Sequence, residues 1–379
     1  MRRYTQEALD SLAKSSEITI VNGQDVLLKR SDRGEVAHID YYEANYQNTD
    51  LVSLPEGEPA SPAEAVDRFR MLFGCHNYNL NEREIYTKYE VLEVSGRKVG
   101  LWRYYLRHRA KSSRPCLIYI HGGGWVAGST YTVENPCKLI AELADAVVFN
   151  IDYSLAPEAK YPAAVEELWT ALKHIYDNAE AYGIDPQRIM VAGDSAGGNL
   201  TAVLALRDRD EGTHMIARQF MLYPAVILGK TVPEGYIWSE SAYDISSQER
   251  ERVLPALGLG RHKDGEAQDG MLQFYVSDPE MAKEPYVSPA LAGSFKGLAP
   301  AIIATAEYDG LRIQGEYYGH QLAQAGVPVR VLRYTGCFHA FFDRLGYVPQ
   351  SEDVCREIAE ELMRISTEQS LEEKKEHRC

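Results

Sequence analysis

The chain has 379 residues, 45% of them hydrophobic and 25% charged, which is an ordinary globular composition that can bury a large core. A formal net charge of -15 argues against binding to nucleic acid or to an anionic membrane surface, since neither attracts an acidic protein. No hydrophobic stretch reaches membrane-spanning length, and no apolar run follows the two arginines after Met1 as a signal peptide requires. We therefore expect a cytoplasmic protein.

The cysteines are scattered along the chain without the paired spacing of a metal site. They are Cys75, Cys116, Cys137, Cys337, Cys355 and Cys379. We expect reduced thiols in the core or at the surface, rather than disulfides or metal ligands.

The first 84 residues are expected to form a cap region that precedes the core. Residues 1 to 60 are polar, rich in tyrosine and poorly periodic. Ser61-Pro62-Ala63-Glu64 then has the pattern of a capping box with proline at the first helical position. This pattern predicts a helix from Ser61 to about Phe73.

Two antiparallel strands, joined at Ser95-Gly96, are predicted between residues 84 and 107, where apolar and polar residues alternate. Buried apolar strands then alternate with helices. The strands are expected at 116–120, 146–151, 188–192, 219–224, 300–306 and 329–334, and the helices at 135–144, 163–181, 199–206, 314–325 and 353–365. Uninterrupted apolar strands that alternate with helices indicate an α/β fold, with a mostly parallel central sheet covered by helices on both faces.

Residues 229–284 interrupt this alternation with glycine, proline and charged residues around short helical pieces. We interpret them as a cap insertion packed over the carboxyl edge of the sheet. The expected division is an N-terminal cap region at 1–84, core at 85–228, cap insertion at 229–284 and core again at 285–379. The charge run at 372–377 is expected to be a frayed, solvated end.

A G-x-S-x-G motif between a predicted strand and a predicted helix indicates a nucleophile. In Gly193-Asp194-Ser195-Ala196-Gly197, the glycines remove side chains that would clash where the strand turns sharply into the helix. Ser195 would then stand exposed at the top of the sheet. The helix that begins beneath it turns free N–H groups and the positive end of its dipole toward any negative charge.

A serine hydroxyl needs a base to take its proton and an acid to orient that base. His339 is the predicted base, because it follows the last apolar strand at the sheet edge where open α/β folds place their sites. Asp309 is the predicted acid, since it lies past the end of the preceding strand and next to a glycine. Glu307 is the alternative acid, and Asp309 could instead only cap the following helix. The chain order of serine, acid and histidine favours the first assignment.

The stretch His121-Gly122-Gly123-Gly124-Trp125 follows another buried strand and predicts an oxyanion hole. Consecutive glycines let the backbone approach a substrate closely and point several N–H groups in one direction. The expected donors are the N–H groups of Gly123, Gly124 and Ala196. The expected supporting residues are Gly122, Asp194 and His121, the last bracing the loop by hydrogen bonding rather than transferring a proton.

The chain resembles the hormone-sensitive-lipase-like family of α/β-hydrolases, and its bacterial carboxylesterases and acetyl esterases in particular. The resemblance covers residues 85–365 and rests on five motifs in order. They are the two glycine-rich motifs above, Asp152-Tyr153-Ser154-Leu155-Ala156-Pro157-Glu158, Tyr286-Val287-Ser288-Pro289 and Ala306-Glu307-Tyr308-Asp309. The resemblance implies an α/β-hydrolase fold, a triad of Ser195, Asp309 and His339, and no cofactor or metal. Ile313 and Gln314 depart from the family, in which an acidic pair usually follows the arginine.

We predict a serine carboxylesterase that hydrolyses short-chain, acetyl-like esters of small molecules through an acyl-enzyme. An acetylated sugar is one candidate substrate, because tyrosines in the expected cap could stack on sugar rings; these are Tyr41, Tyr42, Tyr46, Tyr236 and Tyr243. We expect no nucleic-acid or membrane partner, and a homodimer is left open. The alternatives are an amide or formamide hydrolase on the same triad and a non-hydrolytic small-molecule receptor. The presence of His339 disfavours the receptor, because a plant receptor of this family lacks that histidine.

Overall fold

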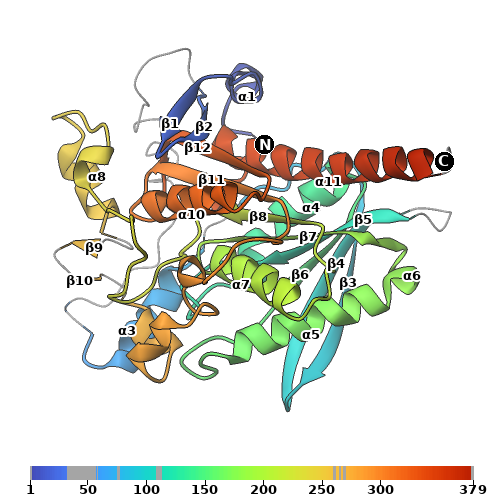
Figure 1. The fold of residues 1–379 in the computed structure, drawn as a ribbon, viewed down its shortest axis with the longest axis horizontal. Helices are drawn as coiled ribbons and strands as arrows, with labels where there is room; N and C mark the ends of the chain where they lie inside the picture. Colours follow the sequence, from blue (N-terminus) through green and yellow to red (C-terminus); the bar gives the residue numbers. More distant parts are fainter. Residues whose placement is uncertain are drawn as a thin grey trace.

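The computed structural model describes residues 2–31, 57, 59–74, 77–107, 113–258, 262–263, 266–267 and 270–376. Within these residues a ten-stranded, mostly parallel sheet has the strand order β1-β2-β12-β11-β8-β7-β5-β6-β4-β3 (Figure 1). The strands are β1 (Ile18–Val21), β2 (Gln24–Lys29), β3 (Ile85–Val94), β4 (Arg97–Leu106), β5 (Arg114–Ile120), β6 (Val147–Asp152), β7 (Ile184–Asp194), β8 (Arg218–Leu222), β11 (Ala301–Tyr308) and β12 (Val329–Phe338).

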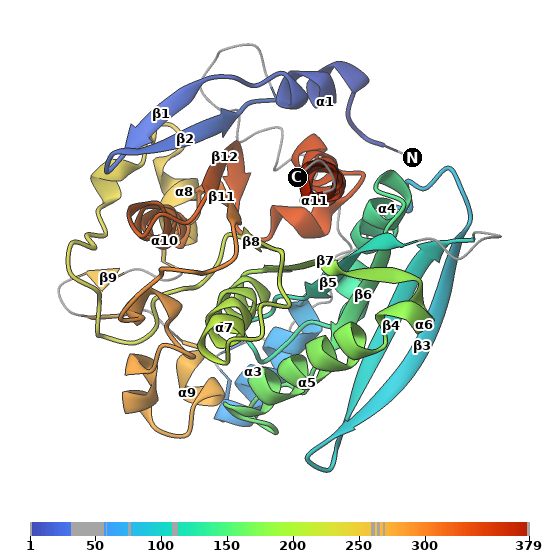
Figure 2. The ribbon, with the colours of Figure 1, turned by 45° about the vertical axis from the view of Figure 1, so that its right-hand side comes forward.

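Helices cover both faces of this sheet, so the predicted α/β architecture is confirmed (Figure 2). The α-helices are α1 (Gln6–Ala13), α3 (Pro62–Leu72), α4 (Glu134–Leu143), α5 (Ala163–Asp177), α6 (Ala179–Tyr182), α7 (Ala196–Asp210), α8 (Arg250–Ala256), α9 (Leu272–Tyr275), α10 (Arg312–Gln324) and α11 (Pro349–Glu376). The alternation along β5 shows the two faces: Leu117 packs in a cluster with α4 and α11, whereas Ile118 packs in one with α5 and α7.

Short 3₁₀ helices connect the main elements. They are η1 (Thr130–Val133), η2 (Glu240–Ala242), η3 (Pro279–Lys283), η4 (Pro289–Leu291) and η5 (Phe341–Arg344). Helix α3 begins as the sequence predicts, because Ser61 Oγ accepts a hydrogen bond from the N–H of Glu64 at 3.2 Å.

The start of the chain differs from the expected cap, because residues 18–29 extend the central sheet. Strand β2 pairs with β12 in parallel, and β1 pairs with β2 on the outside. Val26 and Leu28 of β2 pack against Val331 of β12. Strand β2 thereby covers a strand that would otherwise be an open edge. The cap expectation for residues 1–84 is therefore wrong for this part of the chain.

Two helices also differ from their predicted bounds. The helix expected at 163–181 is divided at Asn178 into α5 and α6. Helix α11 begins at Pro349 and continues to Glu376, so residues 372–376, which the sequence analysis expects to fray, are helical.

The interrupting segment 229–284 contains two separate packed pieces. Helix α8 belongs to a cluster with Tyr243 and Tyr308, above the end of β11. Helix α9 lies on another side, where Tyr275 stacks on Trp125 with ring centroids 4.5 Å apart. Between them lie the two-residue strands β9 (His262–Lys263) and β10 (Glu266–Ala267). Figure 2 shows α8 and α9 well apart.

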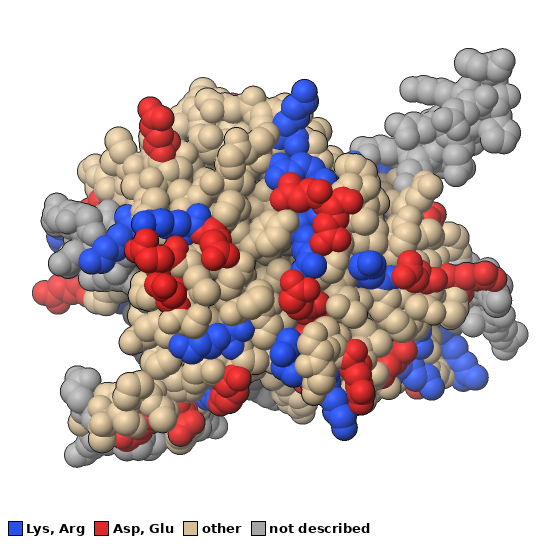
Figure 3. All heavy atoms as spheres, turned by 60° about the horizontal axis from the view of Figure 1, so that its bottom comes forward, with Lys and Arg blue, Asp and Glu red and all other residues tan. Residues whose placement is uncertain are grey.

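The described residues also show how charge is distributed on the surface and where four of the cysteines lie. Acidic and basic side chains are interspersed on the face drawn in Figure 3. No helix in the described ranges is long and apolar enough to cross a membrane. The four cysteines within those ranges are buried and free; they are Cys116, Cys137, Cys337 and Cys355.

Candidate active site

The turn between β7 and α7 holds Ser195 in a strained backbone conformation, with φ 54° and ψ -115°. A Cβ on Gly193 would lie 2.4 Å from the carbonyl oxygen of Gly197. One on Gly197 would lie 2.0 Å from the carbonyl oxygen of Ile120. Glycine is therefore required on both sides of the serine, and the close packing that it permits presents the hydroxyl at the strand end.

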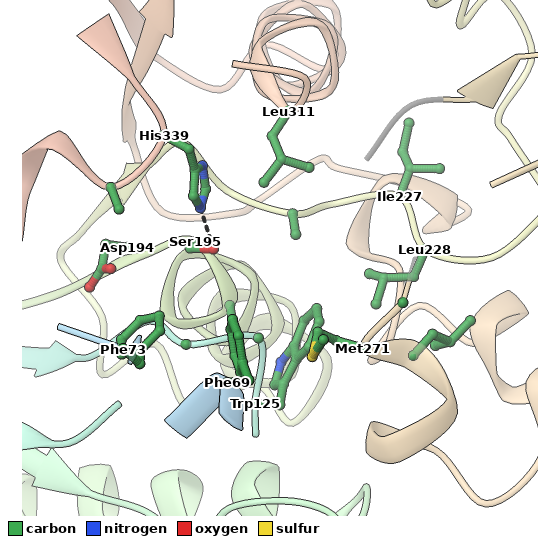
Figure 4. A pocket seen from close by; sticks show the side chains of 17 residues that line it. Phe69, Phe73, Trp125, Asp194, Ser195, Ile227, Leu228, Met271, Leu311 and His339 are labelled. Carbon is green, nitrogen blue, oxygen red and sulfur yellow. Dashed lines mark hydrogen bonds between the residues drawn. The ribbon is translucent and has the colours of Figure 1, made fainter. Parts of the chain in front are cut away.

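The predicted triad residues form one hydrogen-bonded chain. His339 Nε2 lies 2.9 Å from Ser195 Oγ (Figure 4). His339 Nδ1 lies 2.7 Å from Asp309 Oδ2. Asp309 follows β11 and is completely buried, and its other carboxylate oxygen accepts the N–H of Leu311 at 2.9 Å. His339 follows β12, the neighbouring strand. The ends of β11 and β12 are adjacent and the end of β7 lies two strands further along, at the same edge of the sheet, which brings the three side chains together.

Glu307, the alternative acid, has a different partner. Its carboxylate accepts a hydrogen bond from the N–H of Gly336 at 2.8 Å, and burial raises its pKa. The structure therefore brings Asp309, and not Glu307, to His339.

The glycine-rich loop after β5 has the backbone conformation that an oxyanion hole needs. Gly123 and Gly124 have φ of 123° and 60°, a region that other residues rarely adopt. The N–H groups of Gly123, Gly124 and Ala196 have no hydrogen-bond acceptor within the described parts of the chain. All three residues line the same cavity as Ser195. Their N–H groups can therefore donate to an oxygen that becomes negative beside the serine.

Asp194 lies in the serine turn, and its side chain is hydrogen-bonded to the glycine-rich loop. Its Oδ1 accepts the N–H of Gly122 at 3.0 Å and the hydroxyl of Tyr119 at 3.1 Å. A Cβ on Gly122 would lie 2.3 Å from Asp194 Oδ2, so this contact also requires glycine. Burial raises the pKa of Asp194 to about 6.

His121 braces the same loop. Its Nδ1 lies 2.8 Å from the carbonyl oxygen of Gly122, and its ring stacks on Tyr153 with centroids 4.5 Å apart. Complete burial lowers the pKa of His121 to about 4. The imidazole is thus neutral near pH 7, and the distance assigns Nδ1 as the donor to the carbonyl.

A cavity of about 260 Å³ opens above Ser195 and is lined mainly by apolar side chains (Figure 4). These are Phe69, Phe73, Trp125, Ile227, Leu228, Met271, Leu272 and Leu311. Helix α3 and the residue after it supply the two phenylalanines, and Met271 immediately precedes α9. Ile227, Leu228 and Leu311 belong to none of the motifs that indicate the site in the sequence. They follow β8 and β11 at the sheet edge that carries the site, and this position is the feature of the sequence that could have indicated them as lining residues.

The cap tyrosines that suggested a sugar substrate do not line this cavity where they can be placed. The hydroxyl of Tyr243 donates to the carbonyl oxygen of Asp309 at 2.9 Å, and Tyr236 packs edge-on against Tyr317. Tyr41, Tyr42 and Tyr46 lie outside the described residues. Nor do the described residues contain a group of three or more His, Cys, Asp or Glu side chains that could hold a metal ion.

Comparison with known proteins matches residues 117–343 to a family model described as the alpha/beta hydrolase fold. Esterase LipI from Mycobacterium tuberculosis is 35% identical over 244 residues, which cover 64% of this chain and 70% of that protein. An arylesterase from Saccharolobus solfataricus is 33% identical over 231 residues, covering 61% of this chain and 69% of its own. The crystal structure of EstE1, a thermostable carboxylesterase cloned from a metagenomic library, superposes with a TM-score of 0.67 and 32% identity, over 81% of this chain and 98% of that one.

The region matched by the family model includes Ser195, Asp309, His339 and the glycine-rich loop, whereas α3 precedes it. The match spans more than half of the chain, and the similar proteins named above are esterases. The chain belongs to the α/β-hydrolase family, in its hormone-sensitive-lipase-like group of carboxylesterases.

Proposed function

We propose that the protein hydrolyses short-chain carboxylic esters, with Ser195, His339 and Asp309 as its catalytic triad. The observation that carries the proposal is their hydrogen-bonded chain at the floor of a small apolar cavity, beside three N–H groups that have no acceptor among the described residues. Similarity to named esterases and carboxylesterases supports the reaction class.

In the proposed mechanism, Ser195 Oγ attacks the ester carbonyl carbon while His339 Nε2 takes the hydroxyl proton. Asp309 accepts the Nδ1–H of His339, which fixes the tautomer and stabilises the imidazolium. The oxyanion accepts hydrogen bonds from the N–H groups of Gly123, Gly124 and Ala196. His339 then passes its proton to the leaving alcohol. A water molecule, deprotonated by His339, attacks the acyl-enzyme and releases the carboxylic acid and free Ser195.

The size of the cavity supports a preference for short acyl chains. About 260 Å³ is small for a ligand site, and Leu228 and Met271 stand across the cavity from the serine (Figure 4). A longer acyl chain would overpack these side chains. We expect kcat/KM to be highest for acetyl to butyryl esters and to fall steeply by octanoyl.

The apolar lining favours phenyl or small alkyl esters over acetylated sugars. A sugar would bury hydroxyl groups against side chains such as Phe69, Trp125 and Leu228, which offer those groups no hydrogen-bond acceptor. Each polar group buried without a partner costs about 1–3 kcal/mol. The acetylated-sugar substrate, the cytoplasmic location and the homodimer remain predictions.

The test is hydrolysis of a p-nitrophenyl ester series from acetyl to dodecanoyl, with Ser195→Ala as the inactive control. The same assay with p-nitroacetanilide separates an esterase from an amide hydrolase, and acetate release from acetylated sugars tests the sugar class. A flat profile through dodecanoyl, or activation at an oil–water interface, would contradict the proposal. Turnover of the anilide above that of the acetyl ester would favour the amide hydrolase.

A further inference from the structure

The cavity wall opposite His339 is an irregular segment, residues 225–228, which follows β8. Ala225, Ile227 and Leu228 line the cavity, and Figure 4 shows the last two across from Ser195. The segment belongs to no helix or strand, so its buried N–H groups need acceptors from elsewhere. The identity of those acceptors decides where this wall stands.

One side chain of α10 supplies two of the acceptors. Gln314 is completely buried, and its Oε1 accepts the N–H of Val226 at 3.1 Å and that of Ile227 at 3.0 Å. This glutamine stands where the resemblance leads one to expect an acidic residue. Its neutral amide supplies an acceptor oxygen without placing a negative charge beside the cavity.

Two further side chains hold the ends of the segment. Ser288 Oγ accepts the N–H of Leu228 at 3.0 Å and donates to the carbonyl oxygen of Ala282 at 2.7 Å. At the other end, Asn199 Nδ2 donates to the carbonyl oxygen of Ala225 at 2.7 Å. The wall is thus held by side chains of other elements, together with two backbone bonds, from the N–H of Ala225 to the carbonyl oxygen of Ser195 at 3.4 Å and from the N–H of Ala290 to that of Val226 at 3.1 Å.

Helix α10 has little freedom to move relative to this wall. It begins directly behind Asp309, whose carbonyl oxygen accepts the N–H of Arg312 at 3.0 Å. A Cβ on Gly315 would lie 3.1 Å from Thr305 Cγ2 and 3.4 Å from Pro224 Cδ, so the helix backbone is packed closely against the residue that precedes the wall. Gln314 therefore projects from a rigid support.

We propose that Gln314 is a positioning residue that sets the depth of the ester cavity and thereby the acyl-chain preference. This inference rests on the proposed function. Without the amide oxygen, the N–H groups of Val226 and Ile227 would be buried without acceptors, which is unfavourable. The segment then moves toward solvent to satisfy them. Ile227 and Leu228 move with it, and the cavity lengthens.

The test compares Gln314→Met, which keeps the length but loses the acceptor, with Gln314→Glu, which keeps an acceptor. The readout is kcat/KM for acetyl, butyryl and hexanoyl p-nitrophenyl esters. We expect the hexanoyl-to-acetyl ratio to rise about tenfold in Gln314→Met, the scale of methylene discrimination in a pocket. Gln314→Glu should keep the wild-type ratio.

The matched control is Gln219→Leu. Gln219 is also completely buried, and its amide donates to the carbonyl oxygen of Ala299 at 2.7 Å, but it does not line the cavity. This variant should lose stability and keep the wild-type acyl profile. A shifted profile in Gln219→Leu would show that general destabilisation moves the ratio, and would overturn the inference.

An unchanged ratio in Gln314→Met would also overturn the role of Gln314, while leaving the proposed function intact. If that variant does not fold, Ser288→Ala takes its place, because it removes the acceptor of Leu228 in the same wall: a raised ratio supports the inference and an unchanged one overturns it. A folded wild-type protein that hydrolyses none of the esters would refute the proposed function itself.

Discussion

The loops that carry the triad and the helix that covers them are held in place by different interactions. Around Ser195, the backbone leaves no room for a Cβ at Gly193 or Gly197, and hydrogen bonds hold the neighbouring side chains, so very few conformations are permitted. Helix α3 covers the same cavity with two phenylalanines and is tied to the loop by Arg70, which donates to the carbonyl oxygens of Val126 and Ala156 at 2.8 and 3.0 Å. Arg70 also pairs with Glu158 at 2.7 Å.

We infer from this difference that the rigid loops carry out the reaction, whereas helix α3 affects which substrate is used. The rigid loops fall within the region that the family model matches, and α3 falls outside it. Changes to Ser195, His339 or Asp309 in the loops should therefore abolish or greatly lower turnover, whereas changes in the cover should adjust which substrate is used. Substitutions at five positions test this assignment, and we expect the loss of turnover to decrease from the first to the last. The positions are Ser195, Asp309, Arg70, His121 and Lys29.

Ser195→Ala should lower kcat by about 10⁵-fold or more, to the residual rate that the oxyanion hole sustains. His339→Ala should match this loss, because nucleophile and base act as one unit, and the double variant should lose little more. The measurements are steady-state hydrolysis of p-nitrophenyl acetate and labelling by a fluorophosphonate probe. Additive losses, or labelling that persists without Ser195, would contradict the assignment.

Asp309→Asn should lower kcat by about 10⁴-fold, because the amide favours the wrong tautomer of His339. Glu307→Gln is the matched control, since this carboxylate contacts the N–H of Gly336 instead of the histidine. It should lower kcat far less. The reverse ranking would move the acid to Glu307.

Arg70→Met should raise KM for butyryl esters about tenfold and change kcat less, because α3 loses its anchor on the glycine-rich loop and the substrate is held less precisely. Arg68→Met is the control on the same helix, since Arg68 binds Glu64 and the carbonyl oxygen of Gly57 within its own segment. A KM that rises equally in both variants would mean that helix stability, not the anchor, is responsible.

His121→Gln keeps a donor for the carbonyl oxygen of Gly122, so it should affect turnover only slightly and chiefly change the pH dependence of stability. The native pKa of about 4 lies below the ordinary value of 6.5. Between these pH values the unfolded chain binds a proton that the native state does not. His121 therefore lowers the free energy of unfolding as pH falls from 6.5 to 4, by up to about 3 kcal/mol.

Urea unfolding of wild type and His121→Gln at pH 7 and pH 4.5 tests this sign. The variant should lose less stability on acidification than the wild type. The raised pKa of Asp194 increases the free energy of unfolding as the pH falls, which is the opposite effect. Asp194 is present in both proteins, so it cancels when their losses of stability are compared. Equal losses would contradict a neutral, buried His121.

Lys29→Met should leave turnover unchanged and lower the free energy of unfolding by about 3–5 kcal/mol, because it leaves the buried carboxylate of Asp353 without its cation, whereas Glu357 keeps Arg330 at 2.9 Å. Lys29 Nζ lies 2.9 Å from Asp353 Oδ2 and 2.7 Å from Glu357 Oε1, and both the lysine and Asp353 side chains are only 2% exposed. Arg30→Met is the control, since Arg30 forms a partly exposed pair with Glu17. Its effect should be below about 1 kcal/mol. Loss of turnover in a folded Lys29→Met variant would contradict the separation between the residues that carry out the reaction and those that do not.

The features that could be predicted from the sequence depend on neighbouring residues. The strain at Ser195 follows from two glycines within two positions of it, and the N–H groups of Gly123 and Gly124, which have no acceptor among the described residues, follow from the glycine run itself. The strand ends that place Asp309 and His339 follow from apolar runs read along the chain. Short motifs therefore define the chemistry of the site.

The features that could not be predicted depend on contacts between distant positions. Gln314 reaches the N–H of Val226 from 88 positions away, and nothing in either local sequence indicates the other. Strand β2 has only a short apolar run, Val26-Leu27-Leu28, between polar residues, with no alternation to mark a strand, and it becomes a strand through its pairing with β12. Such tertiary partners override local propensity.

The pairing of β2 with β12 has a consequence for how the protein folds as it is synthesised. Lys29 bonds to Glu357, 328 positions later, and Arg2 bonds to Glu352, 350 positions later. On the ribosome β2 therefore cannot complete this pairing until β12 and the start of α11 have emerged, so we expect residues 18–29 to join the sheet after the core strands that lie between them in the chain. During that interval the edge of β2 is unpaired and the outer strand carries the exposed Ile18 and Ile20, so we expect the β1–β2 hairpin to be open to chaperone binding.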